Sequence, residues 1–105
     1  MSFIRHKFNA KRTEVDDIKF SSKAEAAYYS KLKTHKEKGD LIFFLRQVPF
    51  HLPGSVRYVV DFVEFWQSGE VIFTDVKGME TPEFKTKKKI VESLYPITLN
   101  LVKKS

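Results

Sequence analysis

The sequence predicts an α/β fold in which a central mixed sheet is flanked by two helices. Three observations support this prediction: two segments carry helix-capping signals, three strand-like apolar runs lie between them, and a further run follows the second helix. The expected order is helix, strand, strand, strand, helix, strand, which is typical of helices packed around one sheet. With 105 residues, the chain is long enough for one domain with a real core and too short for two.

Residues 1–20 are expected to form a basic arm that ends in a small hairpin, and residues 21–105 a single domain. Ser22 opens the first predicted helix, because Ser22 and Glu25 have the spacing of a capping box, and Gly39 ends it. This helix is expected to bury one stripe of side chains, with Tyr29 beside it: Ala24, Ala27, Tyr28 and Leu32.

Three strand-like runs follow the first helix: residues 41–52, 57–66 and 70–77. The last two are joined by residues 67–69, a three-residue loop that ends in glycine, as is typical of a β-hairpin. If Trp66 pairs with Glu70 across this loop, the register places Asp61 directly opposite Asp75.

The second predicted helix begins at Thr81-Pro82-Glu83, which combines an N-cap residue, a proline at the first helical position and an acid in the first turn. It is expected to run to about Leu94, and Pro96 forces the chain out of the helix. The alternating residues 97–102 are predicted to form the last strand of the sheet.

Charge is distributed unevenly along the chain. The net charge is +6, with +5 on residues 1–38, −2 on residues 39–78 and +3 on residues 79–105. An acidic centre between basic flanks suits a protein that holds a cation and binds a polyanion, so DNA is the expected partner.

The absence of cysteine excludes disulfides and thiolate zinc sites and suits a cytoplasmic protein. No apolar run has the length of a membrane span, so no membrane partner is expected.

Asp61, Asp75 and Lys77 are the first candidates for chemistry. Asp75 and Lys77 lie two apart on a predicted strand and therefore project to the same face. Strand alternation gives Asp61 three apolar neighbours on its own face: Val59, Val63 and Phe65. Opposed carboxylates in such a setting repel each other, and a divalent cation between them would turn repulsion into ligation. The alternatives are pairing of Asp61 with Arg57 and a surface ion pair at the end of the Asp75 strand.

Glu25 is a further candidate acid, because it borders the predicted buried stripe, although the capping box can be its whole role. The lysines of the second helix cover three of its sides, so they cannot all line one site, and a solvated helix face is the alternative. The basic residues expected to contact nucleic acid lie in the arm and on this helix: Arg5, Lys7, Lys11, Arg12, Lys85, Lys88 and Lys89.

An acid on the first helix, an aspartate on the second strand and Asp-x-Lys on the third resemble the PD-(D/E)XK nuclease superfamily, over about residues 22–102. Three segments also look like a family of small phage-encoded proteins long classed as a domain of unknown function: residues 7–16, 22–26 and 75–78. That family is regarded as nuclease-like and related to Holliday-junction resolvases and transposon-end endonucleases. Val60 stands where the superfamily has a proline before its first acid.

The resemblance implies a PD-(D/E)XK core and a metal-dependent endodeoxyribonuclease whose catalytic residues are Glu25, Asp61, Asp75 and Lys77. Asp61, Asp75 and the Val76 carbonyl would ligate Mg²⁺ or Mn²⁺, Glu25 would act through water, and Lys77 would orient the attacking water. It also implies a phage or prophage protein in the bacterial cytoplasm. By analogy it implies a homodimer, since cutting paired strands at a DNA junction needs two sites. Branched DNA is the expected substrate, because the charge pattern favours backbone contacts over sequence recognition.

Three rival hypotheses stand beside this one. The chain could be a non-catalytic nucleic-acid-binding module that keeps the fold and binds equally with or without metal. It could be a protein-interaction factor, which a hairpin register placing Asp61 and Asp75 on opposite sheet faces would favour. It could also be a nuclease with another substrate, such as a site-specific nicking enzyme or a terminase or transposition partner.

Overall fold

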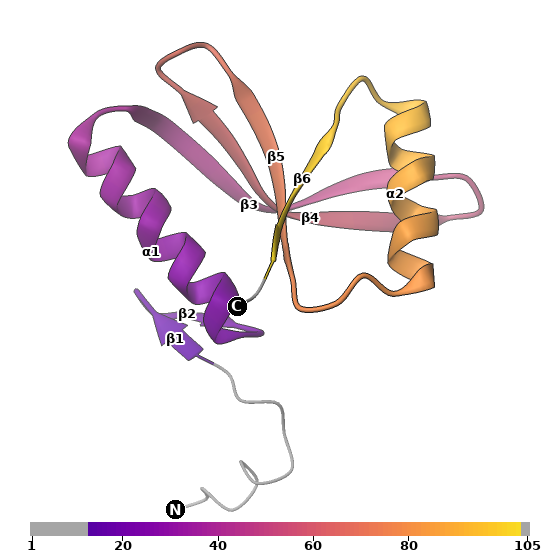
Figure 1. Cartoon of the computed structure of the whole chain (residues 1–105), viewed down its shortest axis with the longest axis horizontal. Helices are drawn as coiled ribbons and strands as arrows, with labels where there is room; N and C mark the ends of the chain where they lie inside the picture. Colours follow the sequence, from indigo (N-terminus) through magenta and orange to yellow (C-terminus); the bar gives the residue numbers. More distant parts are fainter. Residues whose placement is uncertain (1–12, 104–105) are drawn as a thin grey trace, which may run out of the picture.

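A computed structural model of the chain describes residues 13–103 and has the predicted order of elements (Figure 1). The elements are β1 (Thr13–Val15), β2 (Ile18–Phe20), α1 (Lys23–Lys38), β3 (Leu41–Leu52), β4 (Val56–Trp66), β5 (Val71–Lys77), α2 (Pro82–Leu94) and β6 (Leu99–Lys103). The long strands and both helices agree with the sequence prediction to within one or two residues at each end.

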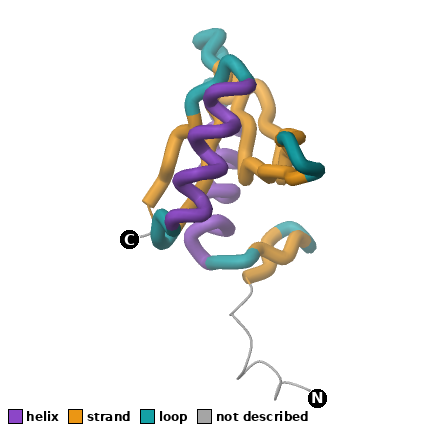
Figure 2. Tube along the Cα trace, turned by 90° about the vertical axis from the view of Figure 1, so that its right-hand side faces the viewer, coloured by secondary structure: helices purple, strands orange, loops and turns teal. Residues whose placement is uncertain are grey.

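The main sheet has four strands in the order β3-β4-β5-β6. The neighbours β3-β4 and β4-β5 are antiparallel and β5-β6 is parallel, so the sheet is mixed, as predicted. α2 supplies the crossover between the two parallel strands. In Figure 2, α2 lies in front of the strands and α1 lies behind them, so the helices cover opposite faces.

Each helix covers its own hydrophobic cluster. On the α1 face, Leu32, Leu41 and Phe62 are buried to 1% exposure or less. On the α2 face, Val60 and Val91 are fully buried. Burying a side chain of this size contributes about 1.5–3 kcal/mol, so both faces of the sheet contribute to stability.

The small hairpin of β1 and β2 is part of the core on the α1 face. Phe20 is 1% exposed, and its ring centroid lies 5.1 Å from that of Tyr29. This contact moves the buried stripe of α1 away from the predicted one. Ala27 is exposed and Ala24 only half-buried, whereas the buried residues are Glu25, Ala26, Tyr29 and Leu32. The reason is that α1 packs against the hairpin as well as the sheet.

The helix ends carry the predicted caps. The Ser22 hydroxyl accepts from the Glu25 N–H at 3.1 Å, and the Thr81 hydroxyl accepts from the Phe84 N–H at 3.1 Å. Gly39 closes α1 with φ of +94°, a left-handed conformation that suits glycine.

A matched irregularity interrupts β3 and β4 at the same level. Arg46 pairs with Phe62 and Val48 pairs with Val60, but the residues between them, Gln47 and Asp61, are left out of the ladder. Gln47 has φ of +53°, which is rare for a non-glycine residue. Phe62 lies in the α1 cluster and Val60 in the α2 cluster, although residues two apart on a regular strand share a face. At this level both strands therefore exchange the faces to which their alternate side chains point, and we call this change the turnover.

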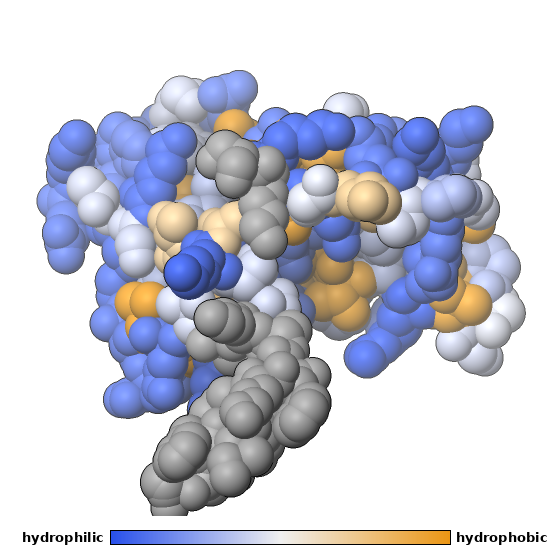
Figure 3. Space-filling model, turned by 60° about the horizontal axis from the view of Figure 1, so that its bottom comes forward, coloured by the Kyte–Doolittle hydropathy of each residue, from blue (hydrophilic) through white to orange (hydrophobic). Residues whose placement is uncertain are grey.

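The surface visible in Figure 3 is mostly hydrophilic, with hydrophobic groups between the polar ones. Neither helix within residues 13–103 has the length and apolar character needed to cross a membrane.

Candidate active site

The hairpin of β4 and β5 has the predicted register. The Trp66 N–H donates to the Glu70 carbonyl at 3.0 Å, and Phe62 pairs with Thr74. The same register places Asp61 opposite Asp75. At the level of Asp61 and Asp75, the strands are joined by hydrogen bonds from backbone N–H groups to the two carboxylates. The Asp61 N–H donates to Asp75 Oδ1 at 2.9 Å, and the Val76 N–H donates to Asp61 Oδ2 at 2.9 Å.

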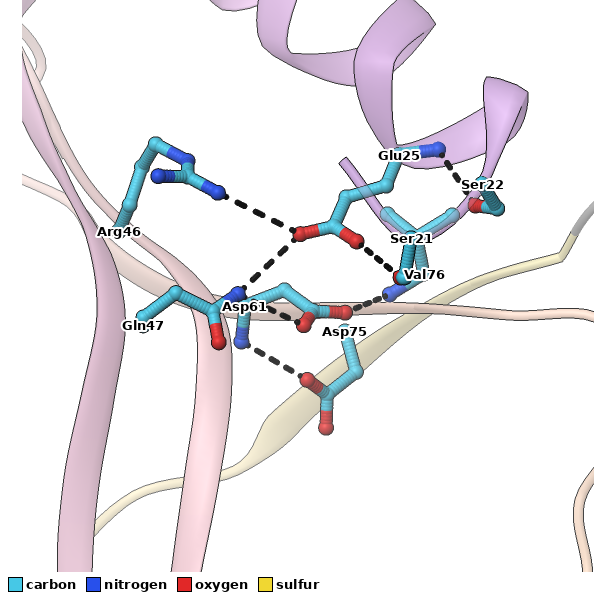
Figure 4. A network of polar contacts seen from close by, with 8 residues as sticks. All are labelled: Ser21, Ser22, Glu25, Arg46, Gln47, Asp61, Asp75 and Val76. Carbon is cyan, nitrogen blue, oxygen red and sulfur yellow. Dashed lines mark hydrogen bonds and ion pairs between the residues drawn. The ribbon is translucent and has the colours of Figure 1, made fainter. Parts of the chain in front are cut away.

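Although Asp61 and Asp75 are opposite in register, their carboxylates lie on different sides of the strands. Asp75 pairs with Leu101 in the parallel ladder, and Leu101 packs in the α2 cluster. The turnover of β4 sends the Asp61 carboxylate towards Glu25, and Figure 4 shows the Asp75 carboxylate turned away from Glu25. The prediction that Asp61 shares a face with Val63 and Phe65 is wrong, because both of these residues pack on the α2 face and the turnover breaks the alternation at Asp61.

Glu25 is a buried carboxylate with more than a capping role. It is 4% exposed and accepts from the Ser21 hydroxyl at 2.8 Å, and Arg46 Nη2 lies 3.9 Å from Glu25 Oε2. Burial raises the pKa of Glu25, and the negative charge of Asp61 raises it further. Glu25 and Asp61 thus form an electrostatically coupled pair of acids.

Gln47 joins these two acids, and sequence reasoning did not identify it. Its Nε2 lies 3.1 Å from Glu25 Oε2 and 3.4 Å from Asp61 Oδ1 (Figure 4). An amide donor between two carboxylates reduces their repulsion without adding a charge. The signal available in the sequence was the polar pair Arg46-Gln47, which interrupts the apolar residues of β3 between Leu45 and Val48.

Asp75 is the most deeply buried acid of the group. It is 0% exposed, and its Oδ2 atom has no hydrogen-bond partner among the residues that the structure describes. Burial raises the pKa of Asp75, whereas the Asp61 N–H and the charge of Lys77 act in the opposite direction. Lys77 points to the same side, as predicted, and its Nζ lies 5.0 Å from the centroid of the Phe84 ring.

Comparison with known protein families assigns the chain to a family. Residues 5–105 match the family model described as "Protein of unknown function (DUF1064)". The chain belongs to this family. No curated protein and no solved structure matches it.

The oxygen donors of this DUF1064 protein match the preference of Mg²⁺ and Mn²⁺ for carboxylate and carbonyl ligands. Asp75 Oδ2, a buried acceptor with no partner in residues 13–103, fits a metal ligand. The arrangement of these donors, however, does not form a complete metal site. Within the described part of the chain, no three acidic or histidine side chains are arranged to hold one ion. The acids form two groups instead, Glu25 with Asp61 on one side and Asp75 with Lys77 on the other.

The predicted phosphate-binding residues fall into three sets. Arg5, Lys7, Lys11 and Arg12 lie outside the described residues. Lys85 and Lys89 are exposed on α2. Lys88 Nζ lies 3.3 Å from Glu92 Oε2, so its charge is partly balanced within the helix. Two cations outside the predicted set, Arg57 and Lys87, line a cavity together with Lys77.

Proposed function

We propose that this DUF1064 protein is a Mg²⁺- or Mn²⁺-dependent endodeoxyribonuclease with a PD-(D/E)XK core, and that it acts on branched DNA as a homodimer. One observation carries the proposal. Three acids from α1, β4 and β5 are connected by hydrogen bonds, in which Gln47 links Glu25 to Asp61 and the backbone N–H of Asp61 holds Asp75 on the other side of the strand. Buried acids with a raised pKa and a neighbouring lysine are typical of sites that perform chemistry.

Each residue has a role in this proposal. Asp61, Asp75 and the Val76 carbonyl would hold the ion, with Glu25 acting through a water molecule. When bound, the ion supplies a water of lowered pKa and stabilises charge on the phosphate. Lys77 orients the attacking water and offsets negative charge as it develops. The Asp61 N–H fixes the rotamer of Asp75 through their 2.9 Å bond.

The placement of Asp61 and Asp75 on different sides of the sheet favours the non-catalytic candidates. It is the arrangement expected of a protein-interaction factor, and together with the basic flanks it also suits a nucleic-acid-binding module without catalysis. Asp61 Oδ2 accepts from the Val76 N–H, and Asp75 projects to the α2 face. Ligation of one ion by both carboxylates therefore requires one of these side chains to turn. If neither side chain turns, the basic surface binds nucleic acid and no metal-dependent reaction follows.

The decisive experiment is incubation of the pure protein with a labelled four-way junction and with matched linear duplex, in Mg²⁺, Mn²⁺ and EDTA. We expect metal-dependent cutting of the junction, and a loss of at least about 100-fold in Asp75→Asn and in Lys77→Met, as removal of a group that stabilises the transition state produces. Asp40→Asn is the matched control. Asp40 is an exposed aspartate that follows the C-terminus of α1, whereas Glu25 lies in the first turn of that helix.

Each outcome selects one hypothesis. Equal cutting of junction and duplex would keep the nuclease and remove the preference for branched DNA. Binding of the junction without cutting in any metal would favour the non-catalytic module. Cutting that persists in EDTA, or in Asp75→Asn, would contradict the proposed mechanism.

A further inference from the structure

A cavity of about 280 Å³ lies between the sheet and the beginning of α2, on the face that carries Asp75 and Lys77. In Figure 1 this is the end of α2 that follows the loop after β5. The residues that matter for its chemistry come from β4, β5 and the start of α2: Arg57, Tyr58, Lys77, Thr81, Glu83 and Lys87.

The cavity has an excess of positive charge. Three cations line it, and its single acid, Glu83, is 78% exposed and lies 3.4 Å from Lys87. Neither Arg57 nor Lys77 forms an ion pair within residues 13–103. The N-terminus of α2, capped by Thr81, adds the positive end of a helix dipole. An anion bound here would relieve the mutual repulsion of these groups.

Tyr58 provides an independent indication of a ligand. The residue lines the cavity and is only 6% exposed, and its hydroxyl has no hydrogen-bond partner among the described residues. A buried hydroxyl without a partner is unfavourable and rare in folded proteins. A phenolic O–H donates readily to an anionic oxygen, so an anion that reached the Tyr58 hydroxyl from the cavity would satisfy it.

We propose that this cavity binds a phosphate group, with Arg57 and Lys87 supplying charge and the Tyr58 hydroxyl supplying a hydrogen bond. The phosphate can belong to the DNA backbone, in which case the inference rests on the proposed nuclease function, or it can be free phosphate, in which case it stands alone. Lys87, rather than the exposed Lys85 and Lys89, is then the lysine of α2 that contacts phosphate.

The first test is thermal unfolding in EDTA with inorganic phosphate, compared with chloride at the same ionic strength. We expect phosphate to raise the Tm of the wild type and of the control Lys85→Gln/Lys89→Gln, which removes the same number of charges from α2 alone. The rise should vanish in Arg57→Gln/Lys87→Gln. Tyr58→Phe should bind phosphate about fivefold more weakly, while its Tm without phosphate stays equal to that of the wild type or exceeds it.

The second test measures binding of a short DNA duplex by fluorescence anisotropy, again in EDTA so that cleavage plays no part. Loss of one phosphate contact should reduce the slope of log K against log salt by about 0.9 in Arg57→Gln/Lys87→Gln, relative to the Lys85→Gln/Lys89→Gln control. A reduced slope identifies the DNA backbone as the source of the phosphate. A Tm effect of phosphate with an unchanged slope identifies free phosphate.

The proposal is overturned if the cavity variants respond to phosphate and to DNA as the wild type does, or if the control loses as much as they do. Because both measurements are made without metal, failure of the nuclease proposal leaves them unaffected. Phosphate binding without any cutting would therefore keep this inference and remove the nuclease.

Discussion

Asp75 and Glu25 are carboxylates placed where the fold disfavours their charge. Burial raises the pKa of both above their ordinary values of 3.8 and 4.5. Asp75 has an acceptor atom without a partner in the described structure, whereas Glu25 is held by Ser21 and Gln47. The two acids therefore store unfavourable electrostatic energy at neutral pH, as is common where a protein binds a cation or transfers a proton.

This placement predicts the pH dependence of stability in EDTA. A carboxyl whose folded pKa is raised contributes stability that is fully present below its unfolded pKa and is lost as pH rises through its folded pKa. On account of Asp75 and Glu25, the free energy of unfolding should therefore increase as the pH falls through their raised folded pKa values towards their ordinary values of 3.8 and 4.5. In Asp75→Asn the increase should be smaller, and the variant should be more stable than the wild type at neutral pH.

Urea denaturation at several pH values measures this effect. The exposed-site variant Asp17→Asn should keep the pH dependence of the wild type, because Asp17 forms no ion pair within residues 13–103. Parallel curves for the wild type and Asp75→Asn would show that the Asp75 carboxyl titrates alike in the folded and unfolded states, which would contradict its burial.

At the scale of single elements, the turn between β1 and β2 contains two aspartates with similar backbone conformations, of which only Asp16 makes side-chain contacts. Asp16 and Asp17 both have positive φ, at 53° and 63°. Asp16 accepts from the Tyr29 hydroxyl at 3.0 Å and lies 3.4 Å from Lys33 Nζ, which lowers its pKa. Asp17 is exposed, and its position demands only a residue that tolerates the left-handed conformation.

Asp17→Gly should therefore raise the free energy of unfolding by about 0.5 kcal/mol, because glycine adopts this conformation without steric cost. Asp16→Gly, one residue earlier with the same backbone requirement, should instead be neutral or destabilising, because it also removes the contact with Tyr29. Chemical denaturation of both variants at neutral pH tests the pair. A stabilised Asp16→Gly would show that the Tyr29 contact contributes nothing.

The whole molecule depends on one sheet that carries a separate hydrophobic cluster on each face. Leu32 lies in the α1 cluster and is 1% exposed, whereas Leu94 lies at the end of α2 and is 52% exposed. β4 contributes residues to both clusters, so loss of either cluster should destabilise the strand that carries Asp61.

Leu32→Ala should lower the free energy of unfolding by about 2–5 kcal/mol, as for other buried leucines. The matched change Leu94→Ala should alter it by less than about 0.5 kcal/mol. Unfolding followed both by far-ultraviolet circular dichroism and by Trp66 fluorescence should give coincident transitions. Two separate transitions would show that the faces of the sheet unfold independently.

Local signals predicted much of this protein. The caps at Ser22 and Thr81, the hairpin register that opposes Asp61 to Asp75, and the shared side of Asp75 and Lys77 all depend on residues close in sequence. Hydrogen bonds and strand alternation act over a few residues, so pattern alone predicts them.

Long-range packing decided the rest. The turnover at Gln47 and Asp61 needs β3 and β4 to deviate together, and it sends Asp61 towards Glu25 rather than to the side of Asp75. The cavity at Arg57, Tyr58 and Lys87 exists only because α2 crosses back over the sheet. Such features arise from contacts between distant segments, whose geometry no single stretch of sequence encodes.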